Sequence, residues 1–269
     1  MRRAADGTVL DLHGPEDAPL VVLIHGVGLN RQCWQWTIPA LAERYRVVTY
    51  DFYGHGESPN PPETPTLGLL SRQLQGVLDA CGADDASIVG FSLGGMIARR
   101  FAQDVPRRTA ALAILHSPHQ RTPEAQAAIE ARVKQARTTG PSSTVEAALE
   151  RWFTDAYRPA NPEMMALVRG WVTANDPAAY HTVYRLLAEG VAEIVAPTPP
   201  IRCPALVLTG DEDFGNGPEM TRAIAAEIEG AEVVILEGLR HMALAEDPPS
   251  VNGPLAAFLD RTMLETRKT

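Results

Sequence analysis

The sequence predicts an α/β fold: a mostly parallel central sheet with helices on both faces and an inserted helical lid. Short apolar runs alternate with amphipathic helical patterns along most of the chain, which is typical of a parallel sheet covered on both sides. One long stretch between two of these runs holds only helical patterns. We therefore expect residues 1–118 and 198–269 to form the core and residues 119–197 to form a helical cap.

Six apolar runs are predicted to be strands. Each is short and rich in aliphatic or β-branched residues, as expected for strands that are buried on both faces. They span residues 20–24, 46–50, 87–89, 111–115, 205–209 and 232–236. After the second run, Leu67, Leu70, Leu74 and Val77 recur at intervals of three and four residues, which predicts an amphipathic helix over 66–81.

The expected cap contains turn signals in place of strands. These signals divide it into about four helices and are Gly140-Pro141, Arg158-Pro159, Asn161-Pro162 and Asp176-Pro177. One crossover rarely needs so many helices, so an insertion over the sheet is the favoured interpretation. Most aromatic side chains of the segment are expected to pack within it, and Trp152 is a candidate for contact with a substrate.

Composition and charge exclude several classes of protein. The formal net charge of −9 over 269 residues offers no basic field for nucleic acid. No run approaches the roughly 18 apolar residues that a membrane span needs. The first residues, MRRAADGTVLDLHG, place no apolar segment behind the arginines, so no signal peptide is expected.

The cysteines indicate a reducing compartment. Cys33, Cys81 and Cys203 are odd in number and far apart, which fits reduced thiols better than a disulfide framework or a metal site. We therefore expect a cytoplasmic protein that binds neither membrane nor nucleic acid. The oligomeric state stays open, with a homo-oligomer among the options.

One serine stands among glycines at a predicted strand-to-helix junction. The stretch Gly90-Phe91-Ser92-Leu93-Gly94-Gly95 follows an apolar run and precedes a helical pattern. This pattern, Gly-x-Ser-x-Gly, is typical of a nucleophile elbow, in which a tight turn holds the serine hydroxyl above the sheet. The alternative is a serine that caps a helix beside flexible glycines.

Further motifs occur in the order that this elbow requires. They are His25-Gly26-Val27-Gly28, the segment 51–58 (DFYGHGES), Gly210-Asp211-Glu212-Asp213, and His241 in HMALAEDP. With them the chain resembles the α/β-hydrolase fold superfamily, and within it small lidded bacterial hydrolases. The resemblance runs from residue 20 to about residue 259 and is weakest in the cap.

A serine hydroxyl needs a base, and the base needs a carboxylate that fixes its tautomer. Ser92 is the predicted nucleophile and His241 the predicted base. The resemblance puts the acid at Asp213, although Asp211 is chemically equal and only the geometry of the fold separates the two. The family usually has a proline four residues after this acid, whereas Pro218 comes five residues after Asp213.

The oxyanion of a tetrahedral intermediate needs N–H donors. The resemblance implies the backbone amides of Val27 and Leu93, and it makes His25 a structural residue under its turn. The glycines at Gly54 and Gly56 lack a dinucleotide fingerprint, so no cofactor is expected.

Four side chains are predicted to face the substrate: Phe91, His116, Trp152 and Arg240. His116 and His119 also look like a metal ligand pair, but no further ligands have suitable spacing, so no metal is expected and both are placed at the pocket edge or behind the catalytic residues. Arg240 has two interpretations: a solvated side chain on the outer edge of its loop, or a group at the pocket mouth that holds an acidic substrate.

The predicted reaction is hydrolysis of a small ester or lactone through an acyl-enzyme. The pattern is most similar to 3-oxoadipate enol-lactonase-like hydrolases and small esterases. Hydrolases that cleave carbon–carbon bonds in ring-fission products are the alternative, but they typically carry asparagine and tryptophan where this chain has Phe91 and Met242. The alternative from a different functional class is a binding protein of the same fold with little turnover.

Overall fold

The computed structural model describes residues 1–265, and its centre is one eight-stranded sheet with the order β1-β2-β4-β3-β5-β6-β7-β8. The strands from β4 to β8 in this order are parallel, whereas β1 and β2 run antiparallel to their neighbours. The strands are β1 (Arg2–Arg3), β2 (Val9–His13), β3 (Leu20–Ile24), β4 (Arg46–Tyr50), β5 (Ala86–Phe91), β6 (Thr109–Leu115), β7 (Ala205–Gly210) and β8 (Glu232–Leu236).

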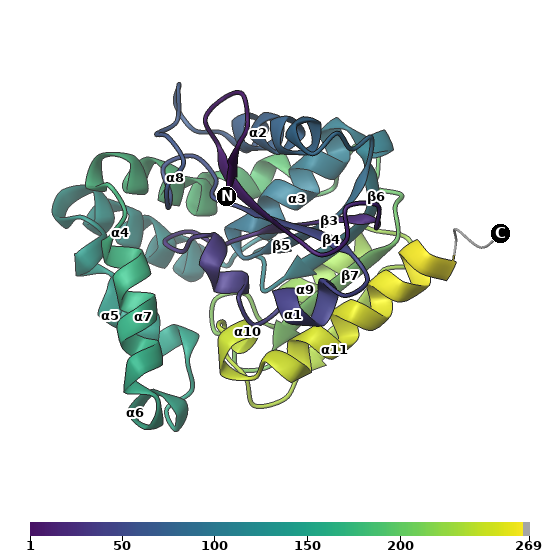
Figure 1. Cartoon of the computed structure of the whole chain (residues 1–269). Helices are drawn as coiled ribbons and strands as arrows, with labels where there is room; N and C mark the ends of the chain where they lie inside the picture. The colour runs from purple at the N-terminus through teal and green to yellow at the C-terminus, as the bar shows by residue number, and fades with distance from the viewer. Residues whose placement is uncertain (266–269) are drawn as a thin grey trace.

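The predicted mostly parallel sheet with helices around it is confirmed (Figure 1). The helices are α1 (Ile38–Leu41), α2 (Leu67–Ala80), α3 (Leu93–Asp104), α4 (Pro123–Thr139), α5 (Val145–Trp152), α6 (Tyr157–Ala160), α7 (Pro162–Thr173), α8 (Pro177–Glu189), α9 (Pro218–Ala226), α10 (Ala243–Glu246) and α11 (Pro248–Leu259). All six predicted strands and the helix predicted over 66–81 are present, while β1 and β2 were not predicted.

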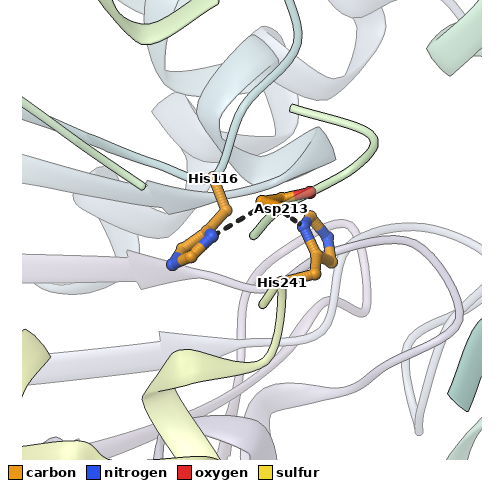
Figure 2. Close-up of side chains that lie close together, drawn as sticks. All are labelled: His116, Asp213 and His241. Carbon is orange, nitrogen blue, oxygen red and sulfur yellow. Dashed lines mark hydrogen bonds and ion pairs between the residues drawn. The ribbon is translucent and has the colours of Figure 1, made fainter. Parts of the chain in front are cut away.

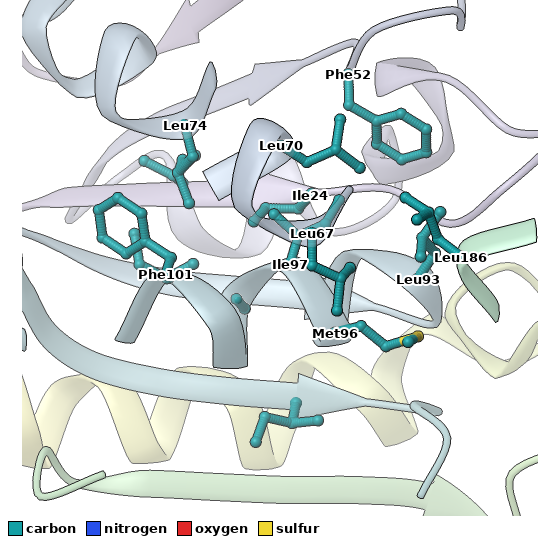
Figure 3. Close-up of a cluster of buried hydrophobic side chains, with 14 of the residues drawn as sticks. Ile24, Phe52, Leu67, Leu70, Leu74, Leu93, Met96, Ile97, Phe101 and Leu186 are labelled. Atoms are coloured by element: carbon teal, nitrogen blue, oxygen red, sulfur yellow. The ribbon is translucent and has the colours of Figure 1, made fainter. Parts of the chain in front are cut away.

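Alternate residues of each central strand point to opposite faces, which gives the protein two hydrophobic layers. On β3, Val22 and Ile24 belong to one cluster of buried side chains, and Val21 and Leu23 belong to the other. The first cluster lies under α2 and α3 and includes Leu67, Leu70, Leu74, Met96 and Phe101 (Figure 3). The second includes Leu255 and Phe258 of α11. Each fully buried side chain of this size contributes roughly 1.5–3 kcal/mol to stability, so the two layers hold the helices against the sheet.

Helices α4 to α8 lie between β6 and β7 in the chain and form a layer at one end of the sheet (Figure 1). We call this segment the inserted helices. The sequence predicts about four helices here and the structure has five, one of which is the short α6 that contains Arg158-Pro159. The boundaries 119 and 197 stay a prediction, and residues 266–269 of the predicted core lie outside the described part of the chain.

The structure describes two features that the sequence analysis addressed, membrane-spanning helices and the state of the cysteines. Within residues 1–265 no helix is long and apolar enough to cross a membrane. Cys33, Cys81 and Cys203 are all free thiols.

Candidate active site

Ser92 occupies a strained turn between β5 and α3. Its backbone has φ 56° and ψ −116°, in the left-handed half of the map that side-chain-bearing residues rarely adopt. The Ser92 N–H donates to the carbonyl of Leu115 on the neighbouring strand at 2.8 Å. A strained backbone of this kind persists only where the surrounding contacts fix it. Such residues are concentrated at functional sites, which makes Ser92 a candidate functional residue.

The glycines around Ser92 are required by close backbone contacts. A Cβ atom on Gly90 would lie 2.2 Å from the carbonyl oxygen of Gly94, and one on Gly94 would lie 2.2 Å from that of Ile24. A Cβ on Gly95 would lie 2.6 Å from the side chain of Ser117. Contacts this short do not occur between real atoms, so the turn can form only without these side chains.

Two backbone amides near Ser92 are free to bind an anion. Within residues 1–265, neither the N–H of Val27 nor that of Leu93 donates to another protein group. Leu93 is the first residue of α3, where the helix dipole favours negative charge. The turn that carries Val27 is fixed from below, since the Gly28 N–H donates to Nε2 of His55 at 2.9 Å and Nδ1 of His25 lies 2.8 Å from the Gly26 carbonyl.

His241 contacts the carboxylate of Asp213. The Nδ1 atom of His241 lies 2.7 Å from Oδ2 of Asp213, and both side chains are almost fully buried (Figure 2). The second oxygen, Oδ1, accepts backbone N–H bonds from Gly215 and Asn216 at 3.1 and 3.0 Å. Because Nδ1 is engaged, Nε2 of His241 is the ring nitrogen left to act as a base.

Asp213 is the acid that the fold brings to His241. Burial alone would raise the pKa of Asp213, but the adjacent His241 and the hydrogen bond from His116 hold it well below its usual range. The carboxylate is therefore ionised, as a partner of an imidazolium must be. The alternative acid, Asp211, is exposed and accepts a hydrogen bond from the Gly238 N–H at 2.7 Å.

His116 lies behind Asp213, which is the second of the two positions expected for it and differs from the substrate-facing one. Its Nδ1 lies 3.0 Å from the same Oδ2 of Asp213 and 3.3 Å from the hydroxyl of Thr209, and its ring is 1% exposed (Figure 2). Burial lowers the pKa of His116, so the neutral ring donates its Nδ1 hydrogen to the carboxylate. The backbone of His116 has φ 50°, a second strained residue at the site. His116 thus lies behind the acid and does not contact the cavity.

His116, Asp213 and His241 also form the group of ligand atoms, all within 4.8 Å of one another, that could hold a metal ion among the described residues. Sequence spacing alone did not predict this group. Hydrogen bonds of 2.7 and 3.0 Å already account for the positions of both imidazoles, and the remaining carboxylate oxygen accepts two backbone amides. The arrangement is explained as a hydrogen-bonded network.

A cavity of about 80 Å³ joins these elements. It is lined by Val27, Ser92, Arg121, Ile129, Arg132, Arg151, Trp152, Tyr184, Leu187, Asp213, Gly215, Asn216 and His241. Ser92 and His241 therefore line one space, and much of its wall comes from the inserted helices. Trp152 is part of its wall, and the centre of its ring lies 6.0 Å from that of His241.

Phe91 and Arg240 do not line this cavity, which corrects the expectation that they touch a substrate. The Phe91 ring is 1% exposed and packs against His241, with ring centres 4.9 Å apart. It sits below the loop of His241 because the strand alternation turns residue 91 away from Ser92. Phe91 thus supports His241 from the core side.

Arg240 joins the His241 loop to the end of α5. It is 8% exposed, which excludes the solvated position, and its Nη1 donates to the carbonyls of Glu150 and Phe153 at 2.9 Å each. Its guanidinium also pairs with Asp155 at 3.0 Å. On the other side of His241, the Met242 N–H donates to the Trp152 carbonyl at 2.8 Å. The side chain thus pairs with the free carbonyls at a helix end and is not among the residues that line the cavity.

Sequence reasoning missed three arginines that line the cavity: Arg121, Arg132 and Arg151. They come from separate elements of the inserted helices, so no local spacing links them. The available signal was weak: Ile129 and Arg132 stand three residues apart on α4 and therefore share a helix face.

Comparison with known families supplies an independent finding. Residues 21–252 match a family model described as the alpha/beta hydrolase family. The match spans the sheet from β3 and the inserted helices to α11.

Individual relatives agree with this match. The chain is 30% identical to (E)-2-((N-methylformamido)methylene)succinate hydrolase of Acinetobacter baylyi, with 92% of each chain covered. It is 25% identical to 3-oxoadipate enol-lactonase 2 of the same organism, over 92% of this chain and 91% of that protein. Among solved structures, an enol-lactonase from Burkholderia xenovorans superimposes with a TM-score of 0.86 at 28% identity, covering 94% of this chain and 97% of that one.

Proposed function

Because the chain belongs to the alpha/beta hydrolase family, we propose that it hydrolyses a small ester or lactone through an acyl-enzyme formed on Ser92. One observation carries this proposal: the strained Ser92 and His241 line the same cavity, and Asp213 lies 2.7 Å from the far nitrogen of His241. The enol-lactonase names of two relatives support an ester or lactone bond as the target.

The geometry supports the following acylation step. The Ser92 hydroxyl oxygen attacks the carbonyl carbon while its proton moves to Nε2 of His241. The resulting oxyanion accepts hydrogen bonds from the N–H groups of Val27 and Leu93. The C–O bond to the leaving group then breaks, and the leaving alkoxide takes the proton from the imidazolium.

Deacylation repeats the chemistry with water. His241 takes a proton from a water molecule, which attacks the acyl carbon, and the proton returns to the Ser92 oxygen as the acid leaves. Asp213 stays ionised throughout and stabilises the imidazolium of each step, since its pKa is held below the usual range. No cofactor or metal takes part in these steps.

The inserted helices act as a lid in this proposal. Trp152 and Tyr184 belong to this segment and line the cavity above Ser92, so they exclude bulk water from the acyl-enzyme. The free thiols of Cys33, Cys81 and Cys203 support a cytoplasmic location. A small-molecule partner, and neither nucleic acid nor membrane, is part of the same proposal.

The test is activity against a panel of p-nitrophenyl esters, lactones and dienones. We expect turnover of esters or lactones that is lost in Ser92→Ala. Turnover of dienones alone would move the reaction to carbon–carbon cleavage. Slow turnover of activated esters only, with tight retention of the product, would favour a binding protein.

A further inference from the structure

Three arginine side chains converge on the cavity that holds Ser92. Arg121 lies in the loop before α4, Arg132 on α4 and Arg151 on α5. Each comes from the inserted helices, and each is partly buried. The chain as a whole carries a formal charge of −9, so this concentration of positive charge in one small space is opposite to the average of the protein.

The three guanidiniums lack carboxylate partners in the protein. Among the described residues, no Asp or Glu oxygen lies within 4.0 Å of Arg121, Arg132 or Arg151. Arg121 donates once, from Nη1 to the Leu187 carbonyl at 2.7 Å. The Nε of Arg132 is buried and has no hydrogen-bond partner. Since a guanidinium carries five N–H donors, most of the donors on these side chains are unused.

The like charges also oppose one another. Burial and the neighbouring Arg132 lower the pKa of Arg121 to about 10, and the same two causes lower the pKa of Arg151. Glu150 and the phenols of Tyr180 and Tyr184 favour the charged form of Arg151 but do not pair with it. Partly buried cations without counter-ions are unfavourable unless a ligand supplies the negative charge.

We propose that Arg121, Arg132 and Arg151 bind the acidic groups of a substrate that carries at least two carboxylates besides the bond that is cleaved. This inference rests on the proposed function for the position of the scissile carbonyl at Ser92. A guanidinium grips a carboxylate through two parallel N–H···O bonds, and such bonds are strongest in a partly dehydrated cleft. Three guanidiniums provide more positive charge than a single carboxylate can neutralise.

The size of the cavity limits the acid further. The small size of the space, about 80 Å³, favours a compact acid over one with a long acyl chain. Binding at the carboxylates places the remaining carbonyl beside Ser92, because both groups line the same cavity. The arginines are therefore assigned to substrate specificity, separate from the bond-breaking residues.

The kinetic test compares two substrates that differ at their two acidic groups. The first is the mono-p-nitrophenyl ester of propane-1,2,3-tricarboxylic acid, which keeps two free carboxylates, and the second is its dimethyl derivative. Arg132→Gln should lower kcat/KM for the charged ester by at least about tenfold and change that for the neutral one by less than about twofold. The matched control is Arg137→Gln, an exposed arginine on the same helix with the same change in charge, which should alter neither by more than about twofold.

A binding measurement separates this inference from the proposed function. Calorimetric titration of Ser92→Ala with propane-1,2,3-tricarboxylate should detect binding that weakens by about tenfold or more when Arg132→Gln is added. If the native chain cleaves neither ester but this binding persists, the proposed function fails and the arginine site stands. Equal losses on charged and neutral esters, or binding that Arg132→Gln leaves unchanged, overturn the arginine site and leave the proposed function untouched.

Discussion

The rings of His116 and His241 meet edge to face, with centres 5.6 Å apart and planes at 84°. Both Nδ1 atoms lie within hydrogen-bond distance of Oδ2 of Asp213. One carboxylate oxygen thus accepts from two imidazoles, of which only His241 reaches the cavity. A neutral donor on the far side of the acid reduces the negative charge that the acid offers to His241.

The first prediction tests this shared oxygen. His116→Phe removes one donor from Asp213 and keeps a buried ring of similar size. The His116 hydrogen bond is one of the causes that hold the pKa of Asp213 below its usual range, so its removal should raise that pKa and move the acidic limb of the pH profile of kcat/KM to higher pH. A limb that stays in place while the melting temperature falls would give His116 a purely structural role.

The second prediction concerns the nucleophile. Ser92→Ala should lower turnover on the order of 10⁴-fold or more with the fold intact, because in the proposed mechanism the hydroxyl forms the covalent bond to the acyl group. A fluorophosphonate should label the native chain at Ser92, which mass spectrometry of the peptides can identify. Labelling at Ser87 or Cys81 would contradict the assignment.

The third prediction separates the two acids. Asp213→Asn should remove most activity, because an amide at 2.7 Å from His241 favours the wrong tautomer. In Asp211→Asn the amide oxygen can still accept the hydrogen bond from the Gly238 N–H, so this variant should retain most of the native kcat/KM. The reverse order of losses, measured on the same ester, would show the acid to be Asp211.

The fourth prediction concerns Arg240. Arg240→Ala removes hydrogen bonds to two carbonyls at the end of α5 and an ion pair, so the free energy of unfolding should fall by about 2 kcal/mol. Arg72→Ala, which breaks an exposed ion pair with Glu63, is the control and should cost less than about 1 kcal/mol. In Arg240→Ala, activity on charged and neutral esters should fall equally. A loss confined to charged esters would show instead that Arg240 binds the acidic group of the substrate.

The fifth prediction tests the turn beneath Ser92. Gly94→Ala brings a methyl group within 2.2 Å of the Ile24 carbonyl, which should destabilise the protein by about 3 kcal/mol or more, or prevent folding. Gly170→Ala on α7 meets open space and should stabilise the helix by up to about 1 kcal/mol. Chemical denaturation of the two variants compares them, and similar stabilities would remove the steric argument.

Sequence patterns predicted the sheet well where strands are buried on both faces. Continuous aliphatic runs such as the one at β3 have no competing interpretation. β2 escaped prediction because Asp11 interrupts a short run whose last residues are only partly buried. Its antiparallel partner, β4, lies far along the chain, and no local pattern announces that pairing.

In the candidate site too, residues in local motifs could be predicted from the sequence, whereas contacts that depend on long-range packing could not. Ser92 and His241 stand in motifs whose spacing reflects a tight local turn and a loop after a strand. The contact between His116 and Asp213 depends on the adjacency of β6 and β7, whose carboxyl ends meet at one edge of the sheet. The inward faces of α4 and α5 follow from packing over the whole segment, which is why only a weak sequence signal pointed to Arg132 and none to Arg151.

Hydrogen bonds on both sides of His241 tie its loop to the end of α5. Arg240 and Met242, on either side of His241, both hold carbonyls of the 150–153 segment. A displacement of α5 away from the sheet must therefore break these bonds or carry the imidazole along with it. Under the proposed function, a molecule that forces α5 outward would also displace His241 from Ser92, so we expect oversize compounds to lower kcat even when they bind.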